Sequence, residues 1–519
     1  MIMKSKKHIG KIILMGMMVL ALFAGISTSA TAASKEIAVG VTSFADTLET
    51  TEQYFSWVVS RYGVGETLVR FDEHGEVAPL LAESWENSEG GKVWKFKIRE
   101  GVKFSDGTEM TPERVKNSLE RTFKLSNRAS TFFAPSSIKV EGQYLVVSTN
   151  TPITVLPECL ADPLFIIVNT DVDTSTFAMN GPVCTGPYVV ESFNPTEVCV
   201  VIKNKYYWNG EVPLDKVTFR CINDQATRSM ALQSGEIQIA YNLKTENLQD
   251  FEDEKKYHIQ SLESLRTTFA FMNEKGVLGD KVLRQAVSRA LNRDIYCKVL
   301  LEGGATPGKA PVPPTLDFGF DELIDENSYN PESAKQLLKE AGYKDIDGDG
   351  FVETPDGKKI QLDFVIYTSR EELKIYAQAA QISLKESWNQ CKDKIQVSYE
   401  TLLDLRDAGR FDLLIWNVLV ANTGDPEKYL RENWYSKSPS NQTGYNNIKV
   451  DELLDKLSAE FDSDERKKLI IEIQQLIMND IPTIFFGYET TYLITSRNVI
   501  NTVLYPTDYY WITNKTALK

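Results

Sequence analysis

The spacing of apolar residues in the first half of the chain is typical of strands. In residues 93–98, Trp94, Phe96 and Ile98 alternate with polar neighbours, a period of two that predicts a strand with one buried face. Residues 36–41 are predicted to form another strand, and short strands separated by Gly, Pro and Asn turns continue from there. We therefore expect a strand-rich, mixed first half.

The second half predicts strands alternating with helices, and helix starts are visible in both halves. Thr111 before Pro112, and Asn330 before Pro331, each place a capping side chain ahead of a proline that needs no N–H bond. Apolar residues on one face predict a helix over residues 280–301. The remaining predictions are helices over residues 332–341, 371–388, 450–461 and 463–479, and strands over residues 360–367, 395–399 and 411–417. This alternation is typical of an α/β lobe.

The first 32 residues differ from the rest of the chain. Lysines 4, 6, 7 and 11 precede an apolar run over residues 12–26, and small residues ending at Ala30 and Ala32 follow. This pattern predicts an export signal cleaved near Ala32, and so a periplasmic or otherwise extracytoplasmic protein. The first cysteine is Cys159, so we expect no lipid anchor on an N-terminal Cys.

Size and charge narrow the functional class. The chain has 519 residues, of which 42% are hydrophobic and 25% are charged, which indicates a globular protein of several domains. Its formal net charge of −15 argues against nucleic-acid binding, which requires a basic surface.

Cysteine chemistry is left open by the sequence. The six cysteines contain no CxxC pair, so zinc and thioredoxin-like sites are not supported. Cys199 and Cys221 lie on neighbouring predicted strands, where a disulfide could form, but buried free thiols are an equal alternative.

Catalysis is not expected from this sequence. The histidines after the predicted signal are His74, in a turn, and His258, among charged residues. Nucleophile-elbow, P-loop, HExxH and dinucleotide-binding motifs are all missing from the sequence.

One segment has the spacing of a calcium-binding loop. In the loop over residues 345–356, carboxylates recur at positions 1, 3, 5, 9 and 12. Gly350 is at position 6, where such a loop makes a sharp turn. The alternative is an Asp/Gly-rich surface turn whose side chains bond their own backbone. The candidate ligands of a structural Ca²⁺ are Asp345, Asp347, Asp349, Glu353 and Asp356.

Several segments together resemble the extracytoplasmic solute-binding proteins of ABC importers, family 5, the dipeptide, oligopeptide and nickel group. The strongest is REGVKFSDG at residues 99–107, followed by residues 111–121. The supporting segments, in family order, are residues 80–85, 185–188, 204–208, 231–239, 283–295 and 424–426. The resemblance covers essentially the whole chain after the signal.

The resemblance implies a fold and a mode of action. The fold would be a cluster-C α/β fold with two hinged lobes around a cleft. Lobe I would comprise residues 33–276 and 488–519, with a small extra domain at about 70–190, and lobe II residues 277–487. Ligand contacts shared by the lobes would favour closure. The protein, a monomer and no enzyme, would deliver its ligand to the transmembrane subunits of an ABC permease.

The resemblance also proposes residues for a peptide ligand. Counting back from Gly424, the family's amine-binding position carries Asn422, and Asp425 is nearby but more typical of a helix cap. Arg370 matches an arginine that binds the ligand carboxylate, for which a guanidinium is suited. The other candidate ligand-binding residues are Arg266, Asn417 and the aromatic residues Tyr54, Trp57 and Trp416.

Short peptides are thus the favoured ligand, with two kinds of alternative. Nickel-binding members use a histidine in the second lobe, and this sequence has none after His258, so a metal-chelate would have to be held by residues such as Arg370. Sugars or other small solutes remain open, and an exported hydrolase is the remote alternative.

Overall fold

The computed structural model describes residues 34–42, 45–367, 370–388, 395–420, 424–441 and 443–519. Residues Glu36–Lys519 fold as one unit, separate from Met1–Lys35. Within the described residues no helix combines the length and the apolar character needed to cross a bilayer. The predicted signal over residues 1–32 lies outside the described part of the chain.

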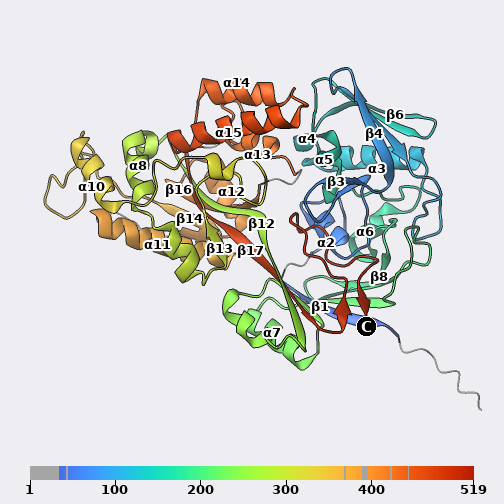
Figure 1. Ribbon diagram of the computed structural model, residues 1–519. Helices are drawn as coiled ribbons and strands as arrows, with labels where there is room; N and C mark the ends of the chain where they lie inside the picture. The colour runs from blue at the N-terminus through green and yellow to red at the C-terminus, as the bar shows by residue number, and fades with distance from the viewer. Residues whose placement is uncertain (1–33, 43–44, 368–369, 389–394, 421–423, 442) are drawn as a thin grey trace, which may run out of the picture. The chain divides into compact units, whose positions relative to one another are not determined.

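The largest element of the fold is a mixed sheet of eleven strands (Figure 1). Ten of them follow one another in the order β15 (Ile395–Val397), β14 (Phe364–Tyr367), β16 (Leu413–Leu419), β12 (Tyr257–Met272), β17 (Thr483–Ser496), β11 (Ile239–Tyr241), β1 (Glu36–Val41), β10 (Lys216–Cys221), β9 (Val198–Lys203) and β8 (Tyr188–Asn194). The eleventh, β13 (Ala305–Pro307), pairs with β17.

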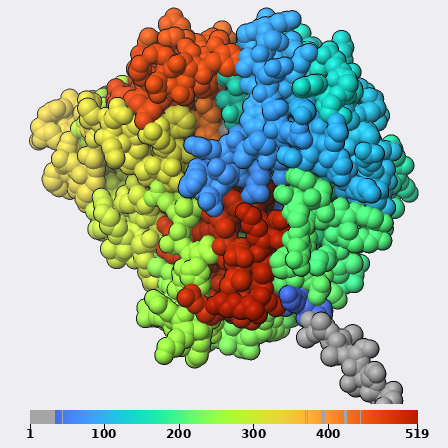
Figure 2. All heavy atoms as spheres, turned by 45° about the vertical axis from the view of Figure 1, so that its right-hand side comes forward, coloured from blue at the N-terminus to red at the C-terminus, as the bar shows by residue number. Residues whose placement is uncertain are grey.

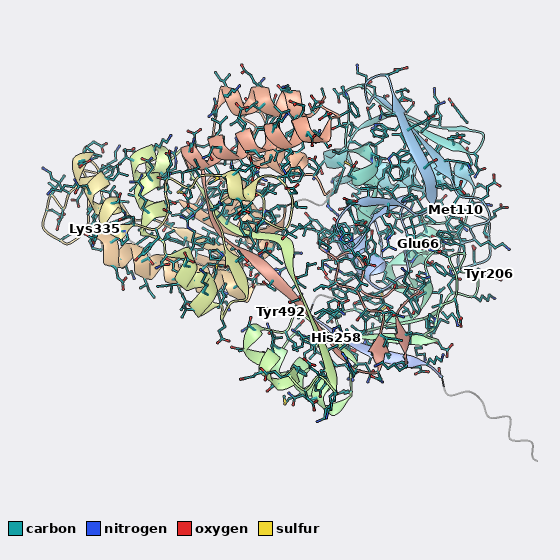
Figure 3. The ribbon with its side chains drawn as sticks, in the orientation of Figure 1. Glu66, Met110, Tyr206, His258, Lys335 and Tyr492 are labelled. Atoms are coloured by element: carbon teal, nitrogen blue, oxygen red, sulfur yellow. The ribbon has the colours of Figure 1, made fainter. Side chains whose placement is uncertain are left out.

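The two long strands β12 and β17 link the two ends of this sheet. The first residues of β12 pair with the last residues of β17, and that part of β17 also pairs with β11. The last residues of β12 pair with the first residues of β17 on one side and with β16 on the other. The pairing is irregular between Glu263 and Thr267. In Figure 3, His258 on β12 and Tyr492 on β17 are labelled in the part of the pair nearer β11.

A smaller antiparallel sheet lies in the first half of the chain. Its strands are β4 (Ala82–Ser88), β5 (Val93–Ile98), β7 (Tyr144–Thr149) and β6 (Pro135–Glu141), with β5 between β4 and β7. The predicted alternation in β5 is confirmed, since Trp94, Phe96 and Ile98 are buried. Two further pairs join β2 (Val69–Phe71) to β3 (Val77–Pro79) and β18 (Val499–Ile500) to β19 (Ala517–Leu518).

The predicted helix starts are confirmed. Thr111 Oγ1 accepts a bond from the N–H of Arg114, and Asn330 Oδ1 accepts one from Ser333. The α-helices are α2 (Phe55–Arg61), α3 (Pro112–Leu125), α4 (Ala129–Phe132), α5 (Leu156–Leu160), α6 (Phe177–Asn180), α7 (Gln225–Ser234), α8 (Lys281–Ala290), α9 (Arg293–Ile295), α10 (Pro331–Glu340), α11 (Glu371–Trp388), α12 (Tyr399–Asp407), α13 (Glu427–Trp434), α14 (Ile448–Leu457) and α15 (Ser463–Asp480). The remaining helical segments are the 3₁₀ helices η1 (Pro163–Phe165), η2 (Thr174–Thr176), η3 (Thr245–Phe251), η4 (Val277–Gly279) and η6 (Phe320–Glu322), and the π-helix η5 (Tyr296–Leu300).

The predicted helix over residues 280–301 was wrong in its length. The helix α8 ends at Ala290, and Leu291 is extended and fully buried. Asn292 then caps a new turn, because its side chain accepts a bond from the N–H of Ile295. A short polar side chain that bonds the backbone in this way interrupts a helix that the apolar pattern alone would continue.

Three predicted strands have other bounds in the structure. Strand β14 contains only the second half of residues 360–367, and β16 starts and ends two residues later than residues 411–417. Ahead of β14 the Asp412 carboxylate accepts the N–H of Asp363, so a side chain replaces a ladder bond there. Strand β15 ends before Ser398, which caps a helix, α12, that the sequence pattern had not predicted.

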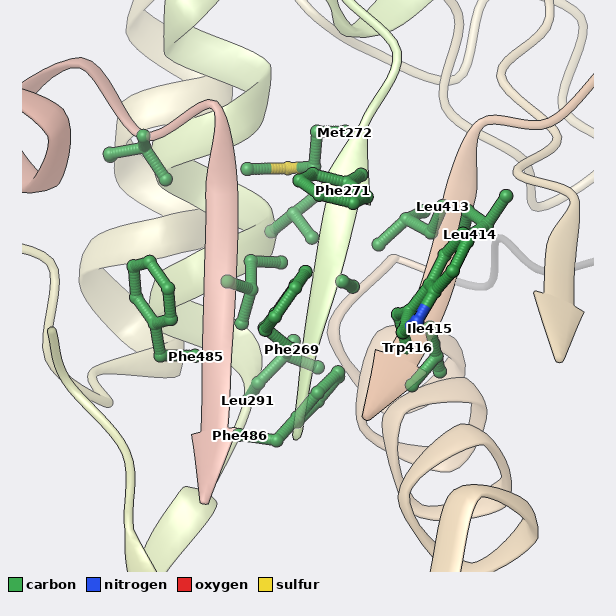
Figure 4. Close-up of a cluster of buried hydrophobic side chains, with 14 of the residues drawn as sticks. Phe269, Phe271, Met272, Leu291, Leu413, Leu414, Ile415, Trp416, Phe485 and Phe486 are labelled. Atoms are coloured by element: carbon green, nitrogen blue, oxygen red, sulfur yellow. The ribbon is translucent and has the colours of Figure 1, made fainter. Parts of the chain in front are cut away.

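The core beside β12 and β16 is strongly aromatic (Figure 4). Phe269 contacts Phe271 edge-to-face at 4.9 Å and lies 6.1 Å from the ring of Phe485 on β17. Burial of these large rings contributes about 2–3 kcal/mol each. Packing on both sides of β12 fixes the position of this strand. Earlier residues of β12 reach the candidate site.

The structure also shows whether the described cysteines form disulfides. The described cysteines are free thiols, and Cys391 lies outside the described residues. Cys199 pairs across the sheet with Phe219 rather than with Cys221, so the two strands do not bring those sulfurs together.

Candidate functional site

A cavity of about 1460 Å³ is lined by residues from distant parts of the chain. One side comes from α2 and from the C-terminal residues Asp508 and Trp511, and the other from β12, β16, β17 and the start of α11. Figure 2 shows the C-terminal residues, in red, at the surface between two green segments. The cavity is larger than most small-molecule sites, which measure about 300–1,000 Å³.

Most of the residues proposed from the sequence meet at this cavity. Those that line it are Tyr54, Trp57, Arg266, Arg370, Trp416, Asn417 and Asp425. The remaining one, Asn422, lies outside the described residues. His74 and His258 are exposed and do not line the cavity.

A chain of hydrogen bonds crosses three strands at the cavity wall. Arg266 Nη1 donates to Asn417 Oδ1 over 3.2 Å, and Asn417 Nδ2 donates to Thr268 Oγ1 over 2.9 Å. Thr268 Oγ1 in turn donates to Glu489 Oε1 over 2.7 Å. The sheet makes this possible because Thr268 on β12 pairs with Asn417 on β16, while β17 lies on the other side of β12.

Two arginines share the wall of the cavity. Burial, together with the positive charge of Arg370, lowers the pKa of Arg266 to about 10. The Arg370 side chain is one-third exposed (33%) and approaches Glu372 to 3.7 Å between Nη1 and Oε1. An anion held by both guanidinium groups would relieve their mutual repulsion and accept several of their N–H donors.

A second titratable group faces the arginines. Burial raises the pKa of the Glu489 carboxyl, and the nearby negative charge of Glu372 adds to the shift. The hydrogen bond from Thr268 and the charges of Arg370 and Arg266 oppose it. The neutral form of Glu489 is therefore favoured over a wider pH range than in water.

Asp425 is held by a buried arginine. Its Oδ2 atom accepts bonds from Arg466 Nε at 3.1 Å and Nη2 at 2.8 Å, and its Oδ1 atom accepts the N–H of Glu427 at the start of α13. This geometry is the helix-starting role that the sequence favoured for Asp425. The carboxylate is thus largely engaged by protein partners.

The aromatic candidates differ in exposure. Trp57 and Trp416 line the cavity but are only 8% and 7% exposed, whereas Tyr54 is 49% exposed. Arg406 lies over the Trp416 ring at 5.4 Å, and Arg128 lies over the Tyr54 ring at 3.8 Å. These rings therefore form walls that also carry cationic groups.

Sequence reasoning missed a charged pair on the α2 side of the cavity. Arg61 Nη2 contacts Asp508 Oδ2 at 2.6 Å, and the Arg61 guanidinium lies 4.7 Å from the Trp511 ring centre. Arg61 follows Trp57 by one helical turn, which was a usable signal. No sequence signal pointed to Asp508, because its partner Arg61 is 447 residues away in the chain.

The Asp-rich loop lies between α10 and β14 and contributes no residue to this cavity. One carboxylate oxygen from each of Asp345, Asp347, Asp349 and Glu353 lies within 4.8 Å of the others. Asp356 is outside this group, and its carboxylate contacts Thr354 and Lys358 instead.

Comparison with known proteins places the chain in a family. Residues 76–442 match the model for bacterial extracellular solute-binding proteins, family 5. The chain is 24% identical over 470 residues to the nickel-binding protein NikA of Staphylococcus aureus, covering 90% of this chain and 91% of that protein. It is 27% identical over 449 residues to the oligopeptide-binding protein AppA of Bacillus subtilis, covering 83% and 82%.

The fold agrees with solved structures of the same two proteins. The S. aureus NikA complex with Ni(L-His)₂ matches with a TM-score of 0.79 at 23% identity, covering 94% of this chain and 100% of that one. The AppA complex with a nonapeptide matches with a TM-score of 0.78 at 22% identity, covering 94% and 99%. The two-lobed cluster-C α/β fold is thereby confirmed, and the protein is a binding protein rather than an enzyme: it belongs to the bacterial extracellular solute-binding proteins of family 5.

Proposed function

We propose that this protein captures short peptides in the cavity and delivers them unchanged to an ABC permease. The observation that carries the proposal is the placement of Arg266 and Arg370 on one cavity wall. A peptide carboxylate can accept bonds from both guanidinium groups, and charge-assisted bonds of this kind are about twice as strong as neutral ones. The cavity volume, about 1460 Å³, is large enough for several residues.

The relatives support this ligand class. AppA of B. subtilis, an oligopeptide-binding protein solved with a nonapeptide, matches over most of its length. In the present chain Tyr54, Trp57 and Trp416 give the cavity apolar surface for ligand side chains. The amine end is proposed to be bound by Asn422, with the Asp508 carboxylate in the cavity lining as a further acceptor.

We propose that binding works through hinged lobes. Residues 33–276 with 488–519 would form lobe I, including an extra domain at about 70–190, and residues 277–487 lobe II. Strands β12 and β17 link the two ends of the large sheet, and the irregular pairing between Glu263 and Thr267 is suited to bending. A ligand that contacts both lobes shifts the equilibrium toward the closed form by its differential affinity. The protein acts as a monomer and is exported by its N-terminal signal, which is cleaved near Ala32.

A peptide panel tests this function. Dipeptides to pentapeptides are titrated while the intrinsic tryptophan fluorescence and the thermal midpoint are recorded. A peptide at a hundredfold excess over Kd should stabilise the protein by about 2.7 kcal/mol. The same peptide with a C-terminal amide, which lacks the negative charge, should bind at least tenfold more weakly than the peptide with a free carboxylate. Equal binding of acid and amide, or cleavage of the peptide seen by mass spectrometry, would contradict the proposal.

A chelated metal is the second candidate, favoured by the paired arginines. Two guanidinium groups suit a ligand with two carboxylates, and S. aureus NikA is solved with Ni(L-His)₂. Among the described residues that line the cavity there is no histidine, so the chelator would have to supply the nitrogen ligands. Binding of Ni²⁺ with excess L-histidine, without binding of any peptide, would favour this function over the first.

A further inference from the structure

The loop between α10 and β14 carries a second group of chemically active side chains, away from the cavity. Figure 3 labels Lys335 on α10, the helix that precedes it. The loop places Asp345, Asp347 and Asp349 at its exposed end and Glu353 at its buried end.

The carboxylates are spaced for one calcium ion. One oxygen of each of the four residues lies within 4.8 Å of the others. Ca²⁺ binds oxygen at about 2.3–2.6 Å, so two ligands on opposite sides of one ion are about 5 Å apart. Four carboxylates this close repel one another unless a cation lies between them.

Glu353 gives an independent indication of a cation site. Its side chain belongs to a residue only 5% exposed, and its Oε1 atom is buried and has no hydrogen-bond partner in the described structure. The other oxygen, Oε2, accepts the N–H of Ile346 over 2.7 Å, and the backbone of Glu353 bonds that of Lys344. A buried carboxylate oxygen without a donor is costly, and a bound cation would remove that cost.

The backbone of the loop already holds the aspartates in place. Asp345 accepts the N–H groups of Gly348 and Gly350 with its two oxygens, and Asp349 accepts the N–H of Phe351. Gly350 has a φ of +87°, which a residue with a side chain rarely adopts. Each carboxylate oxygen retains a further lone pair for a metal.

A lysine partly neutralises the cluster. The Lys359 ammonium contacts Asp349 and lies 4.7 Å from the centre of the Phe351 ring. We infer that this loop binds one Ca²⁺ through Asp345, Asp347, Asp349 and Glu353, displacing Lys359, and that Asp356 takes no part. Because Lys359 competes, the affinity falls in the range of extracellular calcium modules, with a Kd of about 10⁻⁴–10⁻³ M.

Calorimetric titration of the EDTA-treated whole protein with CaCl₂ tests the inference. For the unchanged protein we expect one binding site and a rise of the thermal midpoint with CaCl₂. Asp347→Asn, which changes an exposed residue, and Glu353→Gln should each lower the Ca²⁺ affinity at least tenfold. Lys359→Gln should bind Ca²⁺ at least threefold more tightly, an effect that misfolding cannot produce. Asp356→Asn is the matched control and should bind as the unchanged protein does.

Two results would overturn the inference. One is the absence of both binding heat and thermal shift at 10 mM CaCl₂ in the unchanged protein and in Lys359→Gln. The other is a loss of affinity in Asp356→Asn as large as in Asp347→Asn, which would exclude the four-carboxylate site. Neither result depends on whether the cavity binds peptides.

Discussion

Arg266 and Asn417 lie on adjacent strands, and their side chains meet at 3.2 Å between Nη1 and Oδ1 at the wall of the cavity. Asn417 also donates to Thr268 through its side-chain amide nitrogen. The amide oxygen therefore orients Arg266 while the bond to Thr268 fixes the amide itself. This arrangement presents the Arg266 guanidinium to the cavity in one defined direction.

Replacing Asn417 with Ala should therefore weaken both folding and binding. Thr268 and Arg266 would each lose a buried partner, which costs about 1–3 kcal/mol of stability. We expect a lower urea midpoint and a reduced peptide affinity. A matched control is Asn514→Ala, whose side chain bonds a backbone carbonyl at the surface. Equal losses in both variants would show that Asn417 has no special role.

Arg370→Ala should reduce peptide affinity by about tenfold or more, because a bidentate charged contact is lost. Arg370→Lys should recover only part of it, since an ammonium cannot form the planar double contact. Isothermal titration with one peptide measures the change. Arg220→Ala, which removes an exposed arginine paired with Glu236 and absent from the cavity lining, is the control. Unchanged affinity in Arg370→Ala would remove Arg370 from the site.

Ligand affinity should rise as the pH falls from about 9 toward 6. Burial and Glu372 raise the pKa of Glu489, and a bound carboxylate would raise it further because like charges repel. Binding is then coupled to proton uptake, which lower pH favours. Glu489→Gln should flatten the dependence, measured as Kd against pH. An equally steep dependence in Glu489→Gln would assign the effect to another group.

The same carboxyl should affect stability in the absence of ligand. A raised folded-state pKa means that the folded protein holds its proton to higher pH than the unfolded chain does. Stability contributed by this group is present below the unfolded pKa and is lost as the pH rises through the folded pKa. Glu489→Gln should therefore be more stable than the unchanged protein at pH 9, as urea denaturation can measure. A lower stability at that pH would contradict the assignment.

Arg466→Ala should be strongly destabilising. The Arg466 side chain is only 8% exposed, and it bonds Asp425, Glu427, the backbone of Leu457 and Thr154. Removing it leaves the buried Glu427 and the half-buried Asp425 without the arginine that they share, for which about 3–5 kcal/mol is expected. Thermal unfolding should show a large fall in the midpoint. The neighbouring Lys467→Ala, which removes a partly exposed surface pair with Asp317, should change stability by less than about 1 kcal/mol.

Local patterns carried much of the fold prediction. The alternation in β5, the caps at Thr111 and Asn330 and the extent of α11 were all readable, because each depends on residues within a few positions of one another. The break after α8 and the extra helix α12 were missed, since single capping side chains, Asn292 and Ser398, outweighed the apolar pattern there.

The sequence by itself determined the acidic composition of this protein, the family motifs and the five carboxylates of one loop, of which the structure brings four together. These are properties of neighbouring residues or of composition. Only the tertiary structure decided that Arg266 bonds Asn417, that Asp425 belongs to Arg466, and that Arg61 pairs with Asp508. Such contacts arise when the sheet brings together residues far apart in the chain, and burial then sets their pKa values, which no local pattern records.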